Sequence, residues 1–543
     1  MTPGNDLPVG AVRPLVRRLA GAPDPLVLYR ALSDGGTRPN TFLLESADSS
    51  GATGVRSLLG VRSALRIEAD LSGVSVEAES ENGRAALAWL DQRAGMPLEP
   101  DGPNRRRMPL HRTPARWADE RTRYRQPSPL DLLRLLQSGP RLESRPNEWC
   151  HLLAGVLGYD LIDYFEALPP GRPDPLGQPI VEWCLADRLI VVDHQRLQTT
   201  VVTTAWGGPG YRQRFHDAAR ALEALVAAIA DSAETADTAT PTGPDTGLDP
   251  TVDAVLGERE PAVDQDDLAY GRTVSRVIDH LRAGDAYQVV PSRTFSLPCA
   301  DPLDAYARLR ARNPSPYLFY LRGERRTLLG ASPETCLRVV GPTREVSVMP
   351  IAGTAPRGRR ADGSLDPETD VRNEVALRLD RKESAEHLML VDLARNDVAR
   401  VSLPGTRAVT RLLAIERYTH VMHLVSEVRG TLAPGIDALE AYAATLNMGT
   451  LVGAPKVRAA AILRELEPTR RGCYGGAVGY LTDDGTLETA IVIRSAVVQD
   501  GVAHVRAGAG VVLDSLPERE AAETRHKARA VLEAIVREAP VHA

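Results

Sequence analysis

A long polar stretch divides this sequence into two parts. From Asp231 it runs DSAETADTATPTGPDTGLDP, which is rich in Ser, Thr, Asp, Pro and Gly and nearly free of large apolar side chains. Such a stretch cannot bury enough surface to offset the entropy cost of ordering it. We therefore predict an exposed flexible linker over residues 231–264, between an N-terminal domain, residues 1–230, and a C-terminal domain, residues 265–540.

Hydrophobic periodicity predicts an α+β fold on both sides of this linker. DRLIVVDHQRLQTTVV indicates two strands around a polar turn at Asp193–Arg196, and residues 211–230 have the spacing of an amphipathic helix. Near the C-terminus, apolar strands alternate with turns at Asp484–Gly485 and Asp500–Gly501, and a helix follows from Pro517. Strands joined by tight turns and flanked by helices favour antiparallel sheets with helices on their outer faces.

Composition and charge exclude several classes of function. Lys plus Arg is 65 and Asp plus Glu is 71, so the net charge of −6 argues against a nucleic-acid binder and a polybasic membrane-surface protein. No apolar run approaches the roughly 20 residues of a membrane span, and the start lacks a secretory signal. The five scattered cysteines are typical of reduced thiols, so we expect a cytoplasmic protein.

Two pairs of glutamates could share a metal ion. Glu383 and Glu386 are three residues apart on one predicted helix, and Glu520 and Glu523 repeat the spacing on another. Mg²⁺ prefers oxygen ligands, so two such pairs could meet around it. Taken singly, each pair is equally typical of a solvated helix face.

Other residues could bind or protonate a substrate. Glu334 follows a Ser-Pro turn at the head of a strand, where a partly closed pocket would let it act as an acid, although a glutamate in an exposed turn is the commoner case. Lone histidines among apolar neighbours, such as His387 and His423, are more often core residues than catalysts.

Anionic ligands have a further set of candidate partners. Arg494 lies in an apolar, strand-like segment and needs a carboxylate partner, which a substrate could supply. Gly508 and Gly510 end a predicted strand, where backbone N–H groups can approach an anion. These candidates could hold a divalent metal, bind carboxylates and donate a proton. Together they suggest a small polyanionic substrate.

Many consecutive segments resemble one enzyme family. The chain is similar to the chorismate-utilising enzymes, and most of all to the large component of anthranilate synthase, in the segments GDAYQVVPSRTF, GASPET, PIAGTAPRGRRADGSLD, KESAEHLMLVDLARNDVARV, NMGTLVGAPKVRA, RRGCYGGAVGY and AGAGVVLDSLPEREAAETRHKARAVL. The resemblance is dense from Tyr270 onward and thinner upstream. It implies two interlocked parts whose antiparallel sheets pack as a sandwich with helices outside.

The resemblance assigns roles to individual residues. It implies that Mg²⁺ is held through Glu386 and Glu523, supported by Glu383 and Glu520, and binds the ring carboxylate of chorismate. Glu334 would protonate the departing C4 hydroxyl while ammonia adds at C2, and the product would then lose pyruvate to give anthranilate. The implied catalytic residues are Glu334, His423 and Thr450, and the implied substrate-binding residues are Gly353, Thr354, Tyr474, Arg494, Gly508, Ala509, Gly510 and Lys527.

Two positions separate the branches of this family. Relatives that add water place a lysine base where this chain has Gln288, and glutamine cannot deprotonate water. Relatives that make 4-amino-4-deoxychorismate typically carry a lysine where this chain has Ala352, which cannot form a covalent adduct. Both positions indicate amination at C2.

The resemblance also implies partners and an effector. None of the five cysteines lies on the glycine-flanked elbow of a glutaminase, so a separate glutamine amidotransferase subunit should deliver ammonia, in a heterotetramer of two large and two small subunits. L-Tryptophan would inhibit by binding the N-terminal domain, at Leu44, Glu45, Ser46, Pro316, Tyr317 and Leu318. Two alternatives stay open: a synthase that stops at 2-amino-2-deoxyisochorismate in a specialised pathway, and a non-catalytic tryptophan-binding homologue.

Overall fold

The computed structural model describes most of the chain. The described residues are 6–46, 56–93, 98–110, 119–236, 260–360, 363–418 and 421–536.

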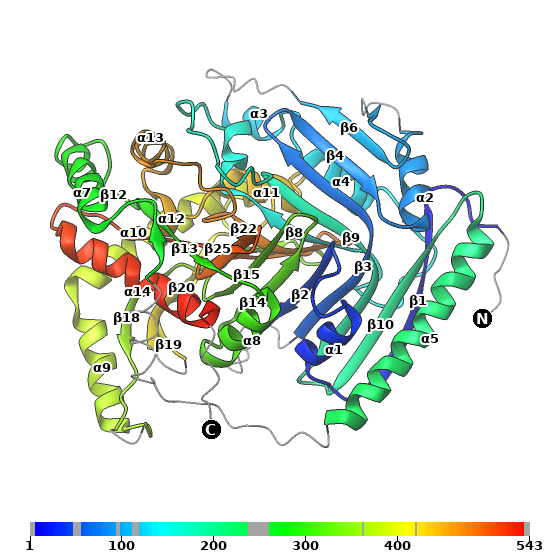
Figure 1. Ribbon diagram of the computed structural model, residues 1–543. Helices are drawn as coiled ribbons and strands as arrows, with labels where there is room; N and C mark the ends of the chain where they lie inside the picture. The colour runs from blue at the N-terminus through cyan, green and yellow to red at the C-terminus, as the bar shows by residue number, and fades with distance from the viewer. Residues whose placement is uncertain are drawn as a thin grey trace.

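The N-terminal half is built on antiparallel strands that are covered by helices (Figure 1). The predicted hairpin is confirmed, because Asp193 at the end of β9 lies opposite Gln198 at the start of β10. Strand β10 pairs in turn with β1, and β9 pairs with β3. The elements are β1 (Ala11–Ala20), α1 (Pro25–Leu32), β2 (Thr41–Glu45), β3 (Arg56–Asp70), β4 (Gly73–Ala78), α2 (Glu81–Leu90), β5 (Glu99–Pro100), β6 (Arg105–Pro109), α3 (Glu120–Tyr124), α4 (Leu130–Ser138), β7 (Arg141–Leu142), β8 (Leu152–Leu157), a 3₁₀ turn η1 (Tyr159–Tyr164), β9 (Val181–Asp193), β10 (Gln198–Trp206) and α5 (Tyr211–Ala236).

The C-terminal half has the strand order that its turns predict. Strands β22 and β23 form one antiparallel hairpin around Asp484–Gly485, and β24 and β25 form another around Asp500–Gly501. The elements are β11 (Ala262–Val263), α7 (Asp267–Arg282), β12 (Gln288–Val289), β13 (Ser292–Pro298), α8 (Pro302–Arg312), β14 (Tyr317–Arg322), β15 (Arg326–Ser332), β16 (Thr335–Val340), β17 (Glu345–Val348), β18 (Ile351–Pro356), α9 (Pro367–Leu379), α10 (Arg381–Val401), β19 (Ala408–Arg417), β20 (Val421–Thr431), α11 (Ala438–Thr445), α12 (Gly449–Val452), β21 (Gly453–Ala454), α13 (Lys456–Leu466), β22 (Ala477–Thr482), β23 (Leu487–Ile491), β24 (Ser495–Gln499), β25 (Val502–Gly508) and α14 (Pro517–Ile535).

Strands from the two halves pair directly with each other. Strand β2 lies between β3 and β14, with Glu45 opposite Leu318. Strand β8 lies between β9 and β22, with Leu157 opposite Ala477. The predicted α+β fold of two interlocked parts is therefore confirmed, and the interlocking is made by shared sheet hydrogen bonds.

The ends of the predicted linker are structured. Helix α5 continues through Asp231 to Ala236, and Ala262–Val263 pair with β13. The linker prediction over 231–264 is therefore too long at both ends, because it counted polar residues that extend the helix and a short edge strand. Residues 237–259 lie outside the described part of the chain.

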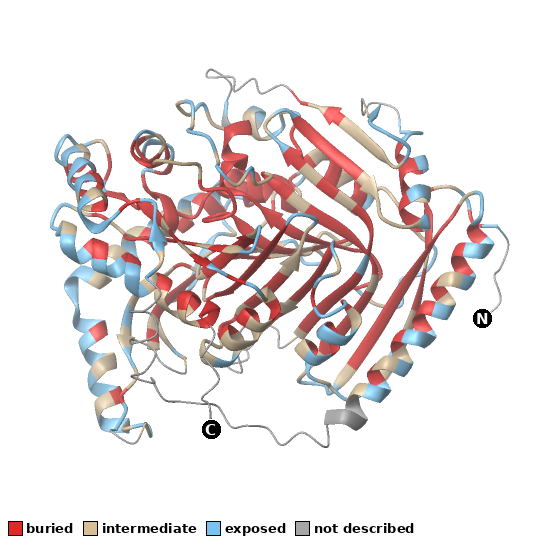
Figure 2. Ribbon diagram, viewed as in Figure 1, coloured by how far each residue is buried: buried red, intermediate tan, exposed pale blue. Residues whose placement is uncertain are grey.

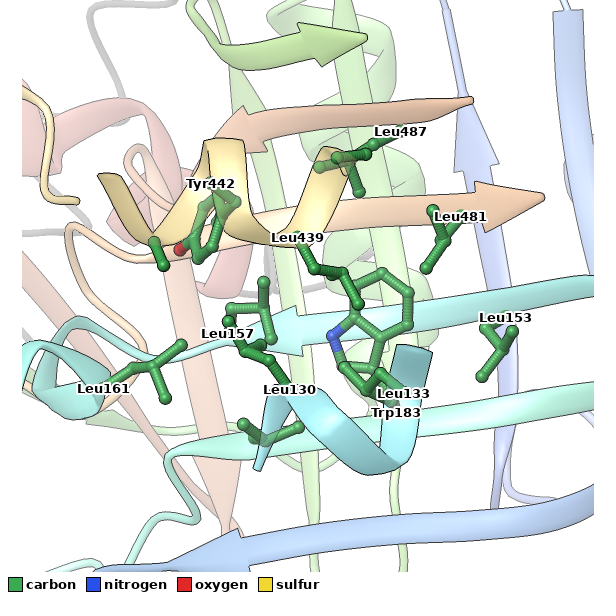
Figure 3. Packing of buried hydrophobic residues seen from close by; sticks show 14 of the residues in the cluster. Leu130, Leu133, Leu153, Leu157, Leu161, Trp183, Leu439, Tyr442, Leu481 and Leu487 are labelled. Atoms are coloured by element: carbon green, nitrogen blue, oxygen red, sulfur yellow. The ribbon is translucent and has the colours of Figure 1, made fainter. Parts of the chain in front are cut away.

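The largest hydrophobic core belongs to both halves. Figure 2 shows that buried residues follow the strands and the inner faces of the helices. In Figure 3, Leu130 and Leu133 of α4 pack with Trp183 of β9 and with Leu439 and Tyr442 of α11. Helices from opposite ends of the chain thus share one core. Among the described residues, no helix combines the length and the apolar character needed to cross a lipid bilayer.

Candidate functional site

Glu334 lies immediately before β16 and is 4 % exposed. Its Oε1 accepts a hydrogen bond from Thr450 Oγ1 at 3.1 Å, and its backbone carbonyl accepts one from the Ile491 N–H at 3.0 Å. Burial raises the pKa of Glu334 to about 8, because the charged carboxylate loses its hydration. The side chain therefore keeps a proton at neutral pH and can donate it. The structure brings together Glu334 and Thr450, two of the three expected catalytic residues.

His423 and Thr354 meet across two paired strands. They lie directly opposite each other on β20 and β18, and Thr354 Oγ1 is 2.9 Å from His423 Nδ1. Burial and then the charge of Arg494 lower the pKa of His423 to about 4, so the imidazole is neutral at physiological pH. A neutral imidazole can accept a proton.

Gly353 lies beside this pair, immediately before Thr354 in the chain. Its φ is +86°, and a Cβ placed there would lie 3.0 Å from Leu424 Cδ1 and 3.4 Å from Glu383 Oε2. The left-handed backbone and the crowded neighbours explain why glycine occupies this position.

The four glutamates lie on two helices, as the spacing predicts. Glu383 and Glu386 belong to α10, and Glu520 and Glu523 belong to α14. Burial raises the pKa of Glu383, and the charges of Glu386 and Glu523 raise it further. Burial also raises the pKa of Glu520, with Glu523 adding to the effect. The two pairs therefore act on each other electrostatically, and this clustered negative charge is what a cation would stabilise.

The donor set of this cluster suits an open cation site rather than a closed one. Within the described residues, no three His, Cys, Asp or Glu side chains already converge as metal ligands. Glu386 Oε1 accepts a hydrogen bond from Gln288 Nε2 at 2.8 Å, and Glu523 pairs with Lys527 at 2.7 Å. Mg²⁺ is commonly held by one or two carboxylates, with water and substrate completing its shell. The residues present therefore fit Mg²⁺.

Gly510 makes room for the Gln288 contact. A Cβ on Gly510 would lie 2.8 Å from Gln288 Nε2 and 3.6 Å from Glu386 Oε1. The adjacent Ala509 is buried, and its N–H already donates to the carbonyl of Pro291 at 3.2 Å. Ala509 therefore fixes the course of the backbone here.

Arg494 and Tyr474 lie near the end of β25. The expectation of Arg494 within a strand is wrong, since it lies between β23 and β24 with a φ of +49°. Burial lowers its pKa, while Tyr474 and Glu523 raise it, so all three groups are close. Among the described residues, no carboxylate forms an ion pair with the Arg494 guanidinium. This cation is therefore available for an anionic ligand.

Gly508 and Lys527 complete this part of the site. Lys527 Nζ donates to the Gly508 carbonyl at 3.1 Å, and a Cβ on Gly508 would lie 3.0 Å from the Tyr474 hydroxyl. Because Gly508 has no side chain, the end of β25 can lie close to the Tyr474 hydroxyl.

A buried charge network behind Tyr474 escaped the sequence analysis. Glu467 is 4 % exposed and accepts hydrogen bonds from Arg471 Nη2 at 2.7 Å, Arg506 Nη2 at 3.0 Å and Ser292 Oγ at 2.7 Å. The Arg471 guanidinium also lies over the Tyr474 ring, 5.6 Å from its centre. The i,i+4 spacing of Glu467 and Arg471 was a visible signal, but such pairs are common on helix surfaces.

His387 is a structural histidine. It is fully buried, with Nε2 at 2.7 Å from Ser426 Oγ and Nδ1 at 3.1 Å from the Ala352 carbonyl. Both ring nitrogens are thus satisfied within the core. The preference for a core role is confirmed for His387, whereas His423 lies in the site.

The expected effector residues gather at the seam between the halves. Leu44, Glu45, Ser46, Tyr317 and Leu318 line a cavity of about 430 Å³, where β2 pairs with β14. Pro316 precedes β14 and does not line this cavity.

The walls of this cavity combine aromatic groups with charges of both signs. Trp149 and Tyr480 supply aromatic surface, and Arg338 and Glu488 supply opposite charges. Such a lining can bind a small aromatic zwitterion.

Comparisons with known proteins find relatives that match most of the chain. The profile of the family described as chorismate binding enzyme matches residues 103–533. Anthranilate synthase component 1 of Salmonella typhimurium is 45 % identical over 502 residues, which is 92 % of each chain. The pyocyanine-specific anthranilate synthase component 1 of Pseudomonas aeruginosa is also 45 % identical, over 91 % of this chain and 90 % of that protein. The crystal structure of anthranilate synthase component I from Streptococcus pneumoniae has a TM-score of 0.64 and 28 % identity, covering 89 % of this chain and 93 % of that one.

Proposed function

The chain belongs to the chorismate binding enzyme family, within it to the anthranilate synthase component 1 proteins, and we propose that it converts chorismate and ammonia to anthranilate and pyruvate. As such it would be a lyase that catalyses the first step of tryptophan biosynthesis. The structural observation that carries the proposal is a buried, protonated Glu334 in the same site as an unpaired Arg494 and two pairs of glutamates.

Glu334 is suited to act on the leaving hydroxyl. Its carboxyl is protonated below about pH 8, and the Thr450 hydroxyl holds Oε1 in one orientation. Protonation of the C4 oxygen of chorismate lets it depart as water while ammonia bonds to C2. The first product is then 2-amino-2-deoxyisochorismate.

Neutral His423 is suited to the second step. Elimination of pyruvate removes the hydrogen from C2 and breaks the bond between the ring and the enolpyruvyl oxygen, which leaves an aromatic ring. An imidazole with a pKa of about 4 can receive that proton, and Thr354 Oγ1 fixes the position of Nδ1.

The two carboxylates of chorismate need separate partners. Arg494, Tyr474 and the backbone at Gly508 and Gly510 would hold the enolpyruvyl carboxylate, with Lys527 beside them. We propose that Glu386 and Glu523 hold Mg²⁺, with Glu383 and Glu520 in support. When bound, Mg²⁺ would neutralise the ring carboxylate, which the four glutamates would otherwise repel.

The release of ammonia from glutamine requires a second protein. All five cysteines are buried, and burial raises the pKa of Cys150 to about 11 and that of Cys473 to about 12, so neither is an activated nucleophile. We propose that a glutamine amidotransferase subunit supplies ammonia in a cytoplasmic heterotetramer. The designation component 1 in the relatives supports a partner component.

We propose that tryptophan inhibits from the cavity between β2 and β14. Its aromatic lining and its charges of both signs match an aromatic amino acid. Since the cavity lies where the two halves pair, tryptophan would weaken chorismate binding, and chorismate would weaken tryptophan binding by the same factor.

Product analysis tests the proposed activity. The purified chain is incubated with chorismate, Mg²⁺ and an ammonium salt at mildly alkaline pH, and anthranilate fluorescence and pyruvate are measured. Both should appear in equal amounts, and glutamine should replace ammonium only when the amidotransferase subunit is added. A matched Glu523→Gln variant should lose most of the activity.

Other outcomes would reject the proposal. A non-fluorescent aminated product without pyruvate would assign the chain to the synthases that stop halfway. Failure to consume chorismate, with intact tryptophan binding, would indicate a non-catalytic homologue.

A further inference from the structure

A second cavity lies between helix α5 and the N-terminal sheet, outside the site described above. It has a volume of about 490 Å³, and a neighbouring cavity of about 500 Å³ shares two of its lining residues, Arg62 and Arg188. Figure 1 shows α5 running along β1 and β10, with α2 near one end of the helix. This volume is in the range of small-molecule sites.

Two arginines face each other in this region. Arg62 of β3 lies directly opposite Arg188 of β9, and Thr203 of β10 lies opposite Arg188 on the other side. Residues directly opposite on antiparallel strands share a face, with Cβ atoms about 5 Å apart, and like charges in such a pair destabilise the sheet. Burial lowers the pKa of Arg188, and the charge of Arg62 lowers it further.

Neither arginine has a direct polar partner. Among the described residues, no group forms a hydrogen bond or an ion pair with either guanidinium. The three acids that line the cavity are engaged elsewhere. Asp187 accepts hydrogen bonds from Asn82 Nδ2 and Thr204 Oγ1 at 2.7 and 2.9 Å. Asp217 pairs with Arg220, and Glu81 pairs with Arg84. The charges of Asp187 and Asp217 favour the charged form of Arg188, but neither carboxylate contacts its guanidinium.

A third cation adds to the positive field. Arg214 of α5 is 8 % exposed, and its guanidinium donates only to backbone carbonyls, among them Trp206 at 2.8 Å and Pro209 at 2.7 Å. Neutral carbonyls satisfy its hydrogen bonds without cancelling its charge. The cavity thus contains more positive charge than its own acids balance by contact.

The rest of the lining suits a ligand with one anionic end. Ser80, the N-cap of the ten-residue helix α2, lines the cavity, so the positive end of the helix dipole faces it. On the α5 side, Ala218, Ala221 and Ala224 leave room where larger side chains would fill the space. The strand side thus carries Arg62 and Arg188, and the α5 side combines apolar alanines with charged side chains.

We propose that this cavity binds a small metabolite with a phosphate or comparable dianionic oxyanion group. Arg62 and Arg188 would each donate to the oxyanion, whose two charges match the two guanidiniums, and the body of the metabolite would lie against the alanines. Binding turns the repulsive cross-strand pair into a bridged one. The site is distinct from the chorismate and tryptophan sites.

The test uses the full-length chain and inorganic phosphate as the probe. Binding is measured by isothermal titration calorimetry at fixed ionic strength, and Tm is compared in phosphate and in chloride. Wild type should bind one phosphate and gain Tm only in phosphate. Arg188→Gln and Arg62→Gln should each weaken binding roughly tenfold or more, as expected when hydrogen bonds to a charged group are lost.

Controls separate the site from general electrostatics. Arg220→Gln removes a positive charge from the same cavity that already pairs with Asp217, so it should leave phosphate affinity unchanged. Without phosphate, Arg188→Gln should be at least as stable as wild type, because the repulsion is gone. The proposal fails if phosphate and chloride raise Tm equally, or if all three variants bind phosphate like wild type.

Discussion

At the scale of single residues, burial separates glutamates with different roles. Glu334 is 4 % exposed and holds its proton up to about pH 8. The Glu523 side chain is 43 % exposed and pairs with Lys527. The same type of side chain is therefore suited to act as an acid in one place and as an anionic ligand in another, because burial controls its contact with water.

Glu334→Gln tests the acid role. The variant should lower kcat by about 100-fold or more, since glutamine cannot donate the proton. In wild type, kcat at a fixed concentration of free ammonia should fall as the pH rises through about 8, where Glu334 ionises. A pH–rate profile checks both. A variant with wild-type kcat would remove Glu334 from the mechanism.

The same variant has a stability signature. The folded pKa of Glu334 lies above its ordinary value of 4.5, so the stability that this group contributes is complete below that value and is lost as the pH rises to about 8. Glutamine does not ionise, so Glu334→Gln does not lose stability in this way as the pH rises. The Tm of the variant minus that of wild type should therefore increase between about pH 5 and 8.

The sequence predicts the place of Glu334 but not its chemistry. The Ser-Pro turn before an apolar strand is visible, and the structure confirms that position. The raised pKa arises because distant segments, including Thr450, close over the side chain. For Arg494 the sequence predicts the wrong local structure. Its apolar neighbours predicted a strand, but its φ of +49° interrupts the strand there.

At the scale of secondary-structure elements, local sequence patterns predict individual helices and strands, but they do not predict the contacts between these elements. Helices α10 and α14 appear where the 3.6-residue period predicts them. The charge of Glu523 on α14 raises the pKa of Glu383 on α10, so the fold brings these two helices near each other. No local pattern specifies that meeting. The network around Glu467 likewise links helix α13 to β13 and β25 by long-range contacts.

Glu467→Gln tests how much that network contributes. Two buried guanidiniums would lose their carboxylate, which should lower the free energy of unfolding by about 3–5 kcal/mol. Glu465→Gln, at an exposed position in the last turn of α13 two residues before Glu467, is the matched control and should change it by less than about 0.5 kcal/mol. Urea denaturation measures both, and equal effects of the two substitutions would contradict a structural role.

The effect of Glu467 should depend on pH in the opposite sense to that of Glu334. Arg471 and Arg506 hold the pKa of Glu467 below its ordinary value of 4.5, despite its burial. Its contribution is therefore present above that value and is lost as the pH falls through the folded pKa. The difference in the free energy of unfolding between wild type and Glu467→Gln should therefore become smaller at acidic pH.

At the scale of the whole molecule, the two halves communicate through shared strands. The cavity between β2 and β14 is formed by both halves, and the cluster containing Phe319, Cys473 and Val492 continues from it toward Tyr474. A ligand in the cavity that changes the pairing of β2 with β14 would therefore act on the strands that hold the catalytic site.

Ser46→Phe tests this path. Ser46 lines the cavity, and its buried Oγ has no hydrogen-bond partner among the described residues, so a phenyl ring there would occupy the ligand space. Tryptophan inhibition should weaken roughly tenfold or more while kcat stays close to wild type. Ser46→Ala, which leaves the space open, should keep inhibition. Inhibition curves that are identical for Ser46→Phe and wild type would place the effector elsewhere.

The pairing of β2 with β14 also constrains how the protein is made. After Glu45 is added to the growing chain, roughly 270 more residues must be added before Leu318, its partner, exists. At the usual speed of synthesis this takes roughly 15 to 55 seconds. During that interval the edges of β2 and β8 lack their final neighbours and can pair with strands of other nascent chains. Cells that make this enzyme in quantity should therefore need chaperones that bind its N-terminal half during synthesis.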